Sequence, residues 1–277
     1  MALHEFGGGW TEIKLGLLQR YLEAWLNVMR NQTFDLIYVD AFAGSGKCSL
    51  KGSDGEVDGS ALRALSLGGF DRYYFFERDK GRAQELRNLC SDPRYSTKTI
   101  IVEEGDGNSL VQKLLSGQDW SATRAVLFLD PYGMEVAWDT LKAISHTQAI
   151  DLWYLFSISG LFRNAALQYS AVDKGKEAIL TRALGTDEWK HALYTQHPQS
   201  GLFDAEPNME RTMEVNDLEL YVKGRLGDIF PLVLEPKRLV NKKNAPLFSL
   251  FFAVSNPSVR AQGIAKNIAD HLLHKLK

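Results

Sequence analysis

The apolar positions near the start of the chain repeat at helical spacing. Residues 11–30, TEIKLGLLQRYLEAWLNVMR, carry an apolar stripe formed by Leu15, Leu18, Leu22, Trp25 and Met29. Positions three, four and seven apart share one face of a helix, so this stretch is predicted to form an amphipathic helix with Thr11 as its N-cap. The helix precedes the first strand pattern and is expected to cover one end of a sheet.

A series of short apolar runs follows. The runs occupy residues 36–40, 72–77, 99–104, 125–130 and 151–159, and helical patterns such as GRAQELRNLC and VAWDTLKAIS fill the intervals. Parallel strands need crossover connections and are buried on both faces, which gives continuous apolar runs of this kind. The pattern therefore predicts an α/β fold with a doubly wound, mainly parallel sheet.

The rhythm changes after Ser159. Residues 160–230 show helical and irregular segments without a buried-strand pattern, and we expect a helical insertion that is a candidate substrate-recognition region. PLVLEPKRLV and APLFSLFFAVSN then predict two strands, which must be antiparallel because their connection is too short for a crossover. The chain is thus divided into an N-terminal helical segment (1–30), a Rossmann-like core (31–159), the insertion (160–230) and a closing hairpin with a final helix (231–277).

The loop after the first predicted strand carries the first candidate chemistry. In LIYVDAFAGSGKCS, residues 36–49, a phosphate loop of the form GxxxxGK followed by Ser or Thr would need glycine at Ala41 and a hydroxyl at Cys48, so that template fails at both ends. The alternative begins with a carboxylate, Asp40, at the end of the strand, after which Gly44 and Gly46 let the backbone turn closely around a ligand. This Asp-x-Phe-x-Gly-x-Gly pattern is the one that S-adenosylmethionine (SAM) methyltransferases use.

Further polar residues stand where the next strands end. Ligands of doubly wound sheets bind beyond the carboxyl ends of the strands, where Glu77 could accept hydrogen bonds from ribose hydroxyls and Asp106 from an adenine amino group. Ser60, near the start of the next helix, could help to bind the methionine carboxylate at the helix N-terminus. The predicted cofactor-binding residues are Asp40, Phe42, Gly44, Gly46, Ser60, Glu77 and Asp106.

Each of these positions also has a simpler interpretation. Glu77 could be a solvated strand end, Asp106 a turn carboxylate, and the Asp-Pro-Tyr-Gly sequence 130–133 an ordinary β-turn, since turns favour those residues. Together with the glycine loop after the first strand, these residues would make four coincidences at the ends of four successive strands. All four together are less probable than any one of them. The joint pattern therefore favours a cofactor site.

The fourth predicted strand ends in FLDPYG, which suggests the acceptor chemistry. Asp130 and the carbonyl of Pro131 could accept hydrogen bonds from an amine, and Tyr132 could stack on a base. VDAFAGSG, Glu77 and FLDPYG resemble motifs of class I SAM-dependent methyltransferases that act on exocyclic amines of nucleic-acid bases. Those enzymes have Asp/Asn-Pro-Pro-Tyr/Phe here, whereas this chain lacks the second proline, which is closer to the Asp-Pro-Phe-Gly of tRNA guanine-N2 dimethyltransferases.

Over nearly its full length the chain resembles the bacterial three-Cys-motif partner (TcmP) family. The resemblance runs from WTEIKLGLLQRYLEAW through YVDAFAGSG and LFLDPYG to FFAVSNP. It implies a methyltransferase-like fold and a three-Cys-motif protein as a possible partner, and it does not establish a substrate.

Composition and charge narrow the partners further. The formal net charge of −2 gives no global attraction to nucleic acid, so any such contact requires a local patch, and the only dense basic cluster is formed by Lys237, Arg238, Lys242 and Lys243. The two cysteines make neither a disulfide framework nor a zinc site, and no metal site is predicted. No secretory signal or membrane-spanning run is recognised, so we expect a cytoplasmic protein without a membrane partner.

Three functions remain open on the sequence alone. The first is N-methylation of a nucleobase amine through Asp130, Pro131 and Tyr132. The second is methylation of a small molecule or protein in a pocket closed by the insertion. The third is a binding module that keeps the fold and acts through a partner.

Overall fold

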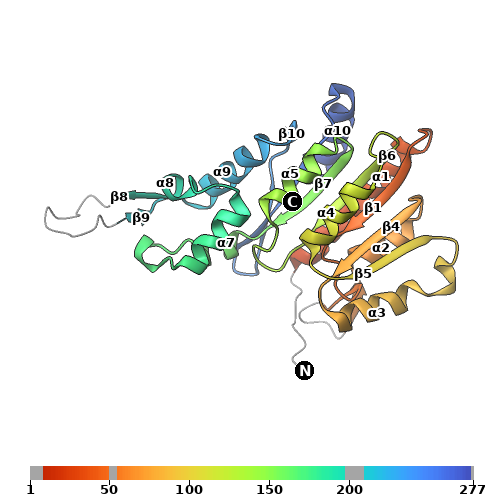
Figure 1. The fold of residues 1–277 in the computed structure, drawn as a ribbon, viewed down its shortest axis with the longest axis horizontal. Helices are drawn as coiled ribbons and strands as arrows, with labels where there is room; N and C mark the ends of the chain where they lie inside the picture. The colour runs from red at the N-terminus through yellow and green to blue at the C-terminus, as the bar shows by residue number, and fades with distance from the viewer. Residues whose placement is uncertain (1–8, 50–54, 197–208, 276–277) are drawn as a thin grey trace, which may run out of the picture.

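The computed structural model describes residues 9–49, 55–196 and 209–275. Its centre is an eight-stranded sheet with the order β10-β12-β7-β6-β1-β4-β5, in which β11 also pairs with β12 (Figure 1). The five parallel strands are β1 (Asp35–Asp40), β4 (Arg72–Glu77), β5 (Thr99–Glu104), β6 (Thr123–Leu129) and β7 (Ile150–Phe156). The predicted parallel strands are confirmed, with bounds shifted by up to three residues.

The closing strands form the predicted antiparallel hairpin. β12 (Pro246–Val254) runs antiparallel to β7 and lies between it and β10 (Leu232–Val233) and β11 (Lys237–Val240). PLVLEPKRLV is therefore two short strands along the same side of β12, because Glu235 and Pro236 interrupt the pairing.

Helices cover both faces of the sheet. On one face, α4 (Gly107–Gly117) and α5 (Trp138–His146) join the insertion in one hydrophobic cluster. On the other face, a second cluster unites α1 (Gly9–Met29), α2 (Ser60–Leu67), α3 (Lys80–Cys90) and α10 (Val259–Lys275). Among the described residues, no helix is both long enough and apolar enough to cross a bilayer.

Helix α1 is longer at its start than the sequence pattern predicts. In the described part of the chain it begins at Gly9, so Thr11 lies inside the first turn and is 3% exposed. The prediction of Thr11 as N-cap is therefore wrong.

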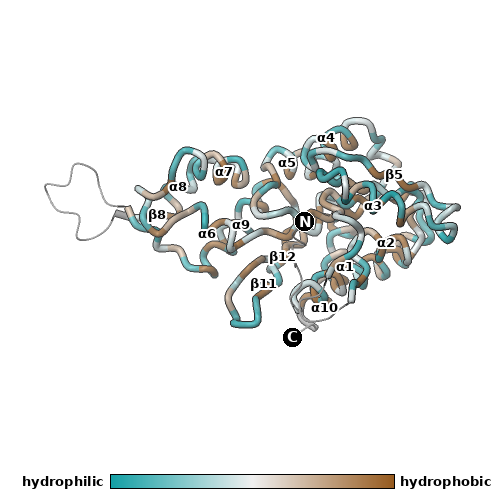
Figure 2. The backbone as a smooth tube through the Cα atoms, turned by 90° about the horizontal axis from the view of Figure 1, so that it is seen from below, coloured by the Kyte–Doolittle hydropathy of each residue, from teal (hydrophilic) through white to brown (hydrophobic). Residues whose placement is uncertain are grey.

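The insertion projects from the β12 side of the sheet, away from β5 (Figures 1 and 2). It contains α6 (Ile158–Asn164), α7 (Lys174–Leu184), α8 (Trp189–Leu193), α9 (Val215–Gly227) and a short 3₁₀ turn at Tyr169–Ala171. Another short 3₁₀ turn, Pro93–Tyr95, lies between α3 and β5. The insertion also contains a small antiparallel sheet of β8 (Tyr194–Gln196) and β9 (Met209–Arg211), which the sequence pattern did not predict. Strands of three residues are too short to show a period-two pattern.

A second small hairpin follows the glycine loop. β2 (Lys47–Ser49) pairs with β3 (Glu56–Asp58) where the sequence suggests only a loop. The residues 50–54 at its tip lie outside the described part of the chain.

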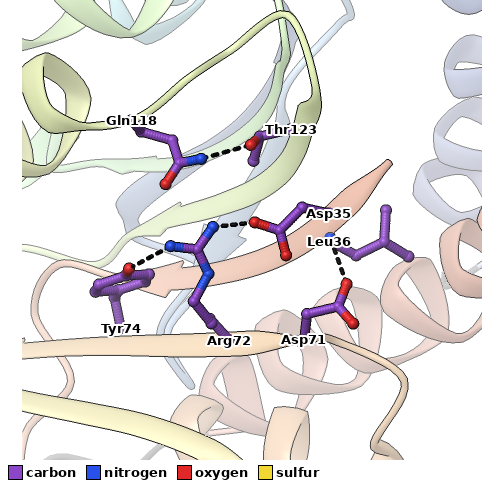
Figure 3. Close-up of polar contacts among 7 residues, drawn as sticks. All are labelled: Asp35, Leu36, Asp71, Arg72, Tyr74, Gln118 and Thr123. Atoms are coloured by element: carbon purple, nitrogen blue, oxygen red, sulfur yellow. Dashed lines mark hydrogen bonds and ion pairs between the residues drawn. The ribbon is translucent and has the colours of Figure 1, made fainter. Parts of the chain in front are cut away.

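Polar contacts fix the strands at the amino edge of the sheet (Figure 3). Arg72 at the start of β4 forms an ion pair with Asp35 at the start of β1, and its other nitrogen donates to the Tyr74 hydroxyl at 3.1 Å. The backbone nitrogen of Leu36 donates to Asp71 at 2.7 Å. These contacts set the register of the neighbouring strands, and thereby the alignment of their opposite, carboxyl ends.

Candidate active site

The loop after β1 turns sharply at two glycines. Gly44 and Gly46 have φ angles of 63° and 86°, a region that glycine adopts without strain. A Cβ on Gly46 would lie 2.8 Å from Cδ1 of Leu86, so this position excludes a side chain as well. The carbonyl of Gly46 also accepts from the nitrogen of Gly59 at 2.8 Å. The glycine loop is therefore held against the start of α2.

Asp40, the last residue of β1, is fully buried. Its Oδ1 accepts from the Phe42 nitrogen at 3.3 Å, whereas Oδ2 has no hydrogen-bond partner among the described residues. Burial raises the pKa of Asp40 from 3.8 to about 7; the charge of Asp130 adds to the rise, while the Ser60 hydroxyl, the Phe42 nitrogen and Lys14 oppose it. An unpartnered, buried carboxylate oxygen is costly to keep unless a ligand completes it.

The raised pKa of Asp40 predicts a pH-dependent stability. Above pH 3.8 the unfolded chain loses this proton while the folded state keeps it up to about pH 7. The folded state then binds more protons, so the free energy of unfolding falls as pH rises through this window. Between pH 5.5 and 8 the expected fall is about 2 kcal/mol, from 1.36 kcal/mol per pKa unit.

Urea unfolding of the ligand-free protein at pH 5.5 and pH 8 would measure this effect. We expect Asp40→Asn to flatten the pH dependence relative to the wild type. Asp151 lies at the amino edge of the sheet, and burial raises its pKa to about 6. It adds the same pH dependence of stability to both proteins, so its contribution cancels when their slopes are compared. Equal slopes for the wild type and Asp40→Asn would contradict the prediction.

Glu77 ends β4 and is 6% exposed. Its Oε2 accepts from the Gly44 nitrogen at 2.9 Å, and its Oε1 accepts from the Asp79 nitrogen at 2.8 Å. Asp79 in turn caps α3 by accepting from the Arg82 nitrogen at 2.9 Å. Glu77 therefore ties the glycine loop to the start of α3, and each of its oxygens keeps a lone pair for a ligand.

Asp106 caps α4. Its Oδ1 accepts from both the nitrogen and the hydroxyl of Ser109 at 3.0 Å. The next residue, Gly107, lies so close to the glycine loop that a Cβ would be 2.5 Å from the Ala41 carbonyl and 3.1 Å from the Phe42 ring. The structural role that the sequence suggested for Asp106 is present, and the same contacts place the start of α4 against the glycine loop.

Asp130 directly follows β6 and forms an ion pair with Lys14 of α1. The Lys14 side chain is only 7% exposed, and its ammonium lies 5.0 Å from the centre of the Trp10 ring. The sequence interpretation missed this residue. Lys14 stands four residues before Leu18 and seven before Tyr21, so a lysine inside the apolar stripe of the helix was the signal that could have found it.

The residues after Asp130 form a partly exposed turn. Pro131 is buried, Gly133 has a φ of 65°, and Tyr132 is 47% exposed. Arg82 of α3 donates to the Tyr132 hydroxyl at 2.6 Å, with its guanidinium carbon 5.2 Å from the ring centre. Burial raises the pKa of Tyr132, and the positive charge of Arg82 opposes this rise.

Neighbouring elements fix this turn. Asn108 of α4 donates to the Glu135 carbonyl at 3.0 Å and accepts from the Ala137 nitrogen at 2.8 Å. From the insertion, Arg182 of α7 donates to the Met134 carbonyl at 3.2 Å. The insertion therefore contacts the turn that carries Asp130 and Tyr132, and neither Asn108 nor Arg182 stood out in the sequence.

The predicted basic cluster is divided in the structure. Arg238 of β11 forms a double contact with Glu219 of α9, in which its Nε donates at 3.0 Å, so its charge is largely matched. Lys242 and Lys243 are exposed on the turn between β11 and β12. Since β12 runs antiparallel to β7, this turn lies beyond the carboxyl edge of the sheet, the same edge as Asp130.

An open groove of about 570 Å³ lies beside that turn. The insertion contributes Phe162 and Arg211 to it, and the closing hairpin contributes Arg238 and Pro246. Arg211 donates to the backbone carbonyls of Ala165 and Met213 at 3.0 and 2.9 Å. The groove thus extends the carboxyl edge toward the insertion.

The structure brings four of the predicted site residues to one edge of the sheet. Asp40, Glu77, Asp106 and Asp130 end or follow four adjacent parallel strands, and the register of those strands places them on one edge. Ser60 is the first residue of α2, and its hydroxyl interacts with the Asp40 carboxylate, where it lowers the pKa of Asp40.

Comparison with known proteins shows the fold. No protein-family model matches the sequence, and no curated protein matches it. Protein LPL1258 from Legionella pneumophila, assigned to the family DUF519, is 13% identical, with 92% of this chain and 90% of that chain covered and a TM-score of 0.53. Trm1 from Pyrococcus horikoshii, solved with S-adenosyl-L-methionine, is 10% identical over 95% of this chain and 58% of that chain, with a TM-score of 0.44. An rRNA methylase from Streptococcus thermophilus is 14% identical over 86% of this chain and 94% of that chain, with a TM-score of 0.37. The predicted Rossmann-like fold class is confirmed.

Proposed function

We propose that this protein is a SAM-dependent methyltransferase that methylates an exocyclic amine of a nucleic-acid base. One observation carries the proposal: four carboxylates, Asp40, Glu77, Asp106 and Asp130, converge beside a tight glycine loop at the carboxyl edge of a parallel sheet. This is the edge at which doubly wound sheets bind nucleotide-like ligands.

The residues on the cofactor side fit SAM in charge and shape. The unpartnered Oδ2 of Asp40 suits the cationic amino group of the methionine part, and the free lone pairs of Glu77 suit the ribose hydroxyls. Gly44 leaves room for a ligand to approach the backbone closely, since a Cβ there would meet no atom within 4 Å, whereas Gly46 and Gly107 let the loop pack against neighbouring parts of the protein. When bound, SAM supplies an electrophilic methyl group on a sulfonium.

The acceptor side fits an amine. The acceptor nitrogen gains positive charge as it takes up the methyl group, so the negative Asp130 stabilises that charge and accepts one N–H. In this proposal the Pro131 carbonyl accepts the second N–H, which aims the nitrogen lone pair, and a base stacks on the half-exposed ring of Tyr132. In a duplex, the target base would have to leave the stack to reach this turn.

A nucleic-acid strand would follow the groove beside the β11–β12 turn. We expect the double charge reversal Lys242→Glu/Lys243→Glu to weaken nucleic-acid binding, because two exposed cations at the carboxyl edge become anions. Each lost phosphate contact lowers the slope of log affinity against log salt by about 1. Fluorescence anisotropy of a labelled single strand at several salt concentrations measures both quantities.

The matched control is Lys113→Glu/Lys266→Glu, which changes the net charge equally on exposed faces of α4 and α10. The control should bind nearly as well as the wild type. Equal effects of the two double variants would mean that net charge alone decides binding and that the turn makes no specific contact.

The function itself is tested with SAM carrying a radiolabelled methyl group. The full-length protein is offered single-stranded RNA, single-stranded DNA, duplex DNA and a panel of small amines, and methylated nucleosides are identified by mass spectrometry. Label on a base nitrogen supports the proposal. Label only on small amines or on protein would favour the closed-pocket alternative, and absence of SAM binding would favour a binding module.

A three-Cys-motif protein as partner remains a prediction of the family resemblance, and the same assay repeated with such a protein tests it.

A further inference from the structure

Helix α1 brings a buried cation to the acceptor side from outside the sheet. The Lys14 ammonium contacts Oδ2 of Asp130, and only 7% of its side chain is exposed. At its other end α1 is fixed to the sheet, because Tyr21 and Trp25 donate to Asp151 of β7 at 2.6 and 2.9 Å. Lys14 is thus held by a rigid, anchored helix.

The Lys14 ammonium contacts Asp130 and also acts on Asp40 through its charge. Asp40 at the end of β1 feels the negative charge of Asp130, which raises its pKa, and the positive charge of Lys14, which lowers it. The other titratable groups that interact with this cluster are Tyr38 of β1, Cys48 of β2, Arg63 of α2 and Tyr132 of the acceptor turn. A buried ammonium beside two carboxylates keeps at least one of them ionised.

The pair leaves one oxygen of Asp130 for the substrate. Oδ2 is taken by Lys14, while Oδ1 makes no hydrogen bond among the described residues, and the side chain is 21% exposed. A carboxylate has no donor of its own when ionised, so Oδ1 can only accept.

We propose that Lys14 is a positioning residue of the methyl transfer: by binding Oδ2 it orients Asp130 so that an ionised Oδ1 faces the acceptor amine. This inference rests on the proposed function and adds the N-terminal helix to its machinery. Lys14 acts through Asp130 and needs no contact with the substrate.

The geometry makes an unusual prediction for an amide at position 130. In Asp130→Asn, the Lys14 ammonium can bind only the amide oxygen, because the amide NH₂ is a donor. The NH₂ group then faces the N–H groups of the acceptor amine, and two donors cannot form a hydrogen bond with each other. Removing the ammonium in Lys14→Met/Asp130→Asn frees the amide to rotate and to present its oxygen. The same Lys14→Met change should therefore lower activity in the wild-type background and raise it in the Asp130→Asn background.

The test measures kcat/KM and SAM affinity for the wild type, Lys14→Met, Asp130→Asn and the double variant. We expect Lys14→Met to lose at least tenfold in kcat/KM and the double variant to exceed Asp130→Asn by at least threefold, on the scale of a charged hydrogen bond. SAM affinity is measured in the same variants, since the Lys14 charge also acts on Asp40, and kcat/KM for the acceptor is compared at saturating SAM. Lys14→Arg keeps the charge and should retain most of the activity, which separates positioning from mere packing.

A pH profile gives a second readout. Without Lys14, Asp40 loses a positive charge that lowers its pKa, so the pKa of its carboxyl rises and the acid limb of kcat/KM moves to higher pH. An unshifted limb, or a Lys14→Met effect of the same sign in both backgrounds, overturns the inference.

Cys48 reports on the cluster without any activity. Burial raises the pKa of its thiol and Lys14 lowers it, so Lys14→Met should slow alkylation of Cys48 by iodoacetamide at pH 8. The measurement uses a Cys90→Ser background, since Cys90 is the only other cysteine.

The two levels of proposal fail differently. A wild type that binds SAM and transfers methyl groups, with Lys14→Met equally active, refutes the role of Lys14 alone. A wild type that neither binds SAM nor transfers a methyl group refutes the proposed function, and the role of Lys14 falls with it.

Discussion

Asp130→Ala is expected to lower the rate of methyl transfer about 100-fold or more, since it removes a charged hydrogen bond and the anion that stabilises positive charge on the acceptor nitrogen. It also leaves Lys14 without its partner next to the reacting nitrogen, where a cation opposes the developing charge. SAM affinity should change less than about threefold, because the cofactor contacts are assigned to Asp40, Glu77 and Asp106. Single-turnover rates with saturating SAM, together with calorimetric titration of SAM, measure the two quantities separately.

Stability must be followed in the same experiment. An unpaired, buried Lys14 lowers the free energy of unfolding, by up to about 3 kcal/mol, so activity is compared at a temperature where both proteins are folded. Asp139→Ala is the matched control: this aspartate lies in the first turn of α5, its side chain is 82% exposed, and among the residues that the structure describes it pairs only with Lys142. Wild-type transfer by Asp130→Ala would end the assignment of the acceptor turn.

Glu77→Ala is expected to weaken SAM binding about 100-fold or more. Two hydrogen bonds from ribose hydroxyls to a buried carboxylate contribute about 1.5 kcal/mol each at least, and 1.4 kcal/mol corresponds to a factor of ten. The change also releases the Gly44 and Asp79 nitrogens, which loosens the glycine loop and lowers affinity further. Calorimetric titration of both proteins with SAM gives the ratio of dissociation constants.

The control for loop loosening is Asp79→Ala. It removes the cap of α3, where Asp79 accepts from the Arg82 nitrogen, and should cost about 1 kcal/mol of stability. Because Asp79 is assigned no contact with the ribose, SAM affinity should change less than about threefold. A loss of SAM affinity equal to that of Glu77→Ala would show that the integrity of the α3 start, and not the Glu77 carboxylate, decides binding.

The sequence by itself determined the strands of the parallel sheet and the residues at their ends. Buried parallel strands appear as continuous apolar runs, and parallel strands share one carboxyl edge, so Asp40, Glu77 and Asp130 could be assigned to one edge from their positions alone. The antiparallel hairpin followed in the same way from a connection too short for a crossover. The structure shortens or extends these elements by a few residues and keeps their order.

Only the tertiary structure decided which charges meet. Lys14 and Asp130 are 116 positions apart, and their pairing depends on how α1 packs across the sheet, which no local pattern encodes. The match of Arg238 with Glu219 likewise depends on α9 packing beside β11, and it removes Arg238 from the basic cluster that composition suggested. The three-residue strands β2, β3, β8 and β9 are set by pairing rather than by periodicity. Local patterns reflect burial of one segment at a time, whereas ion pairs and short hairpins depend on contacts that form only when distant segments are packed together.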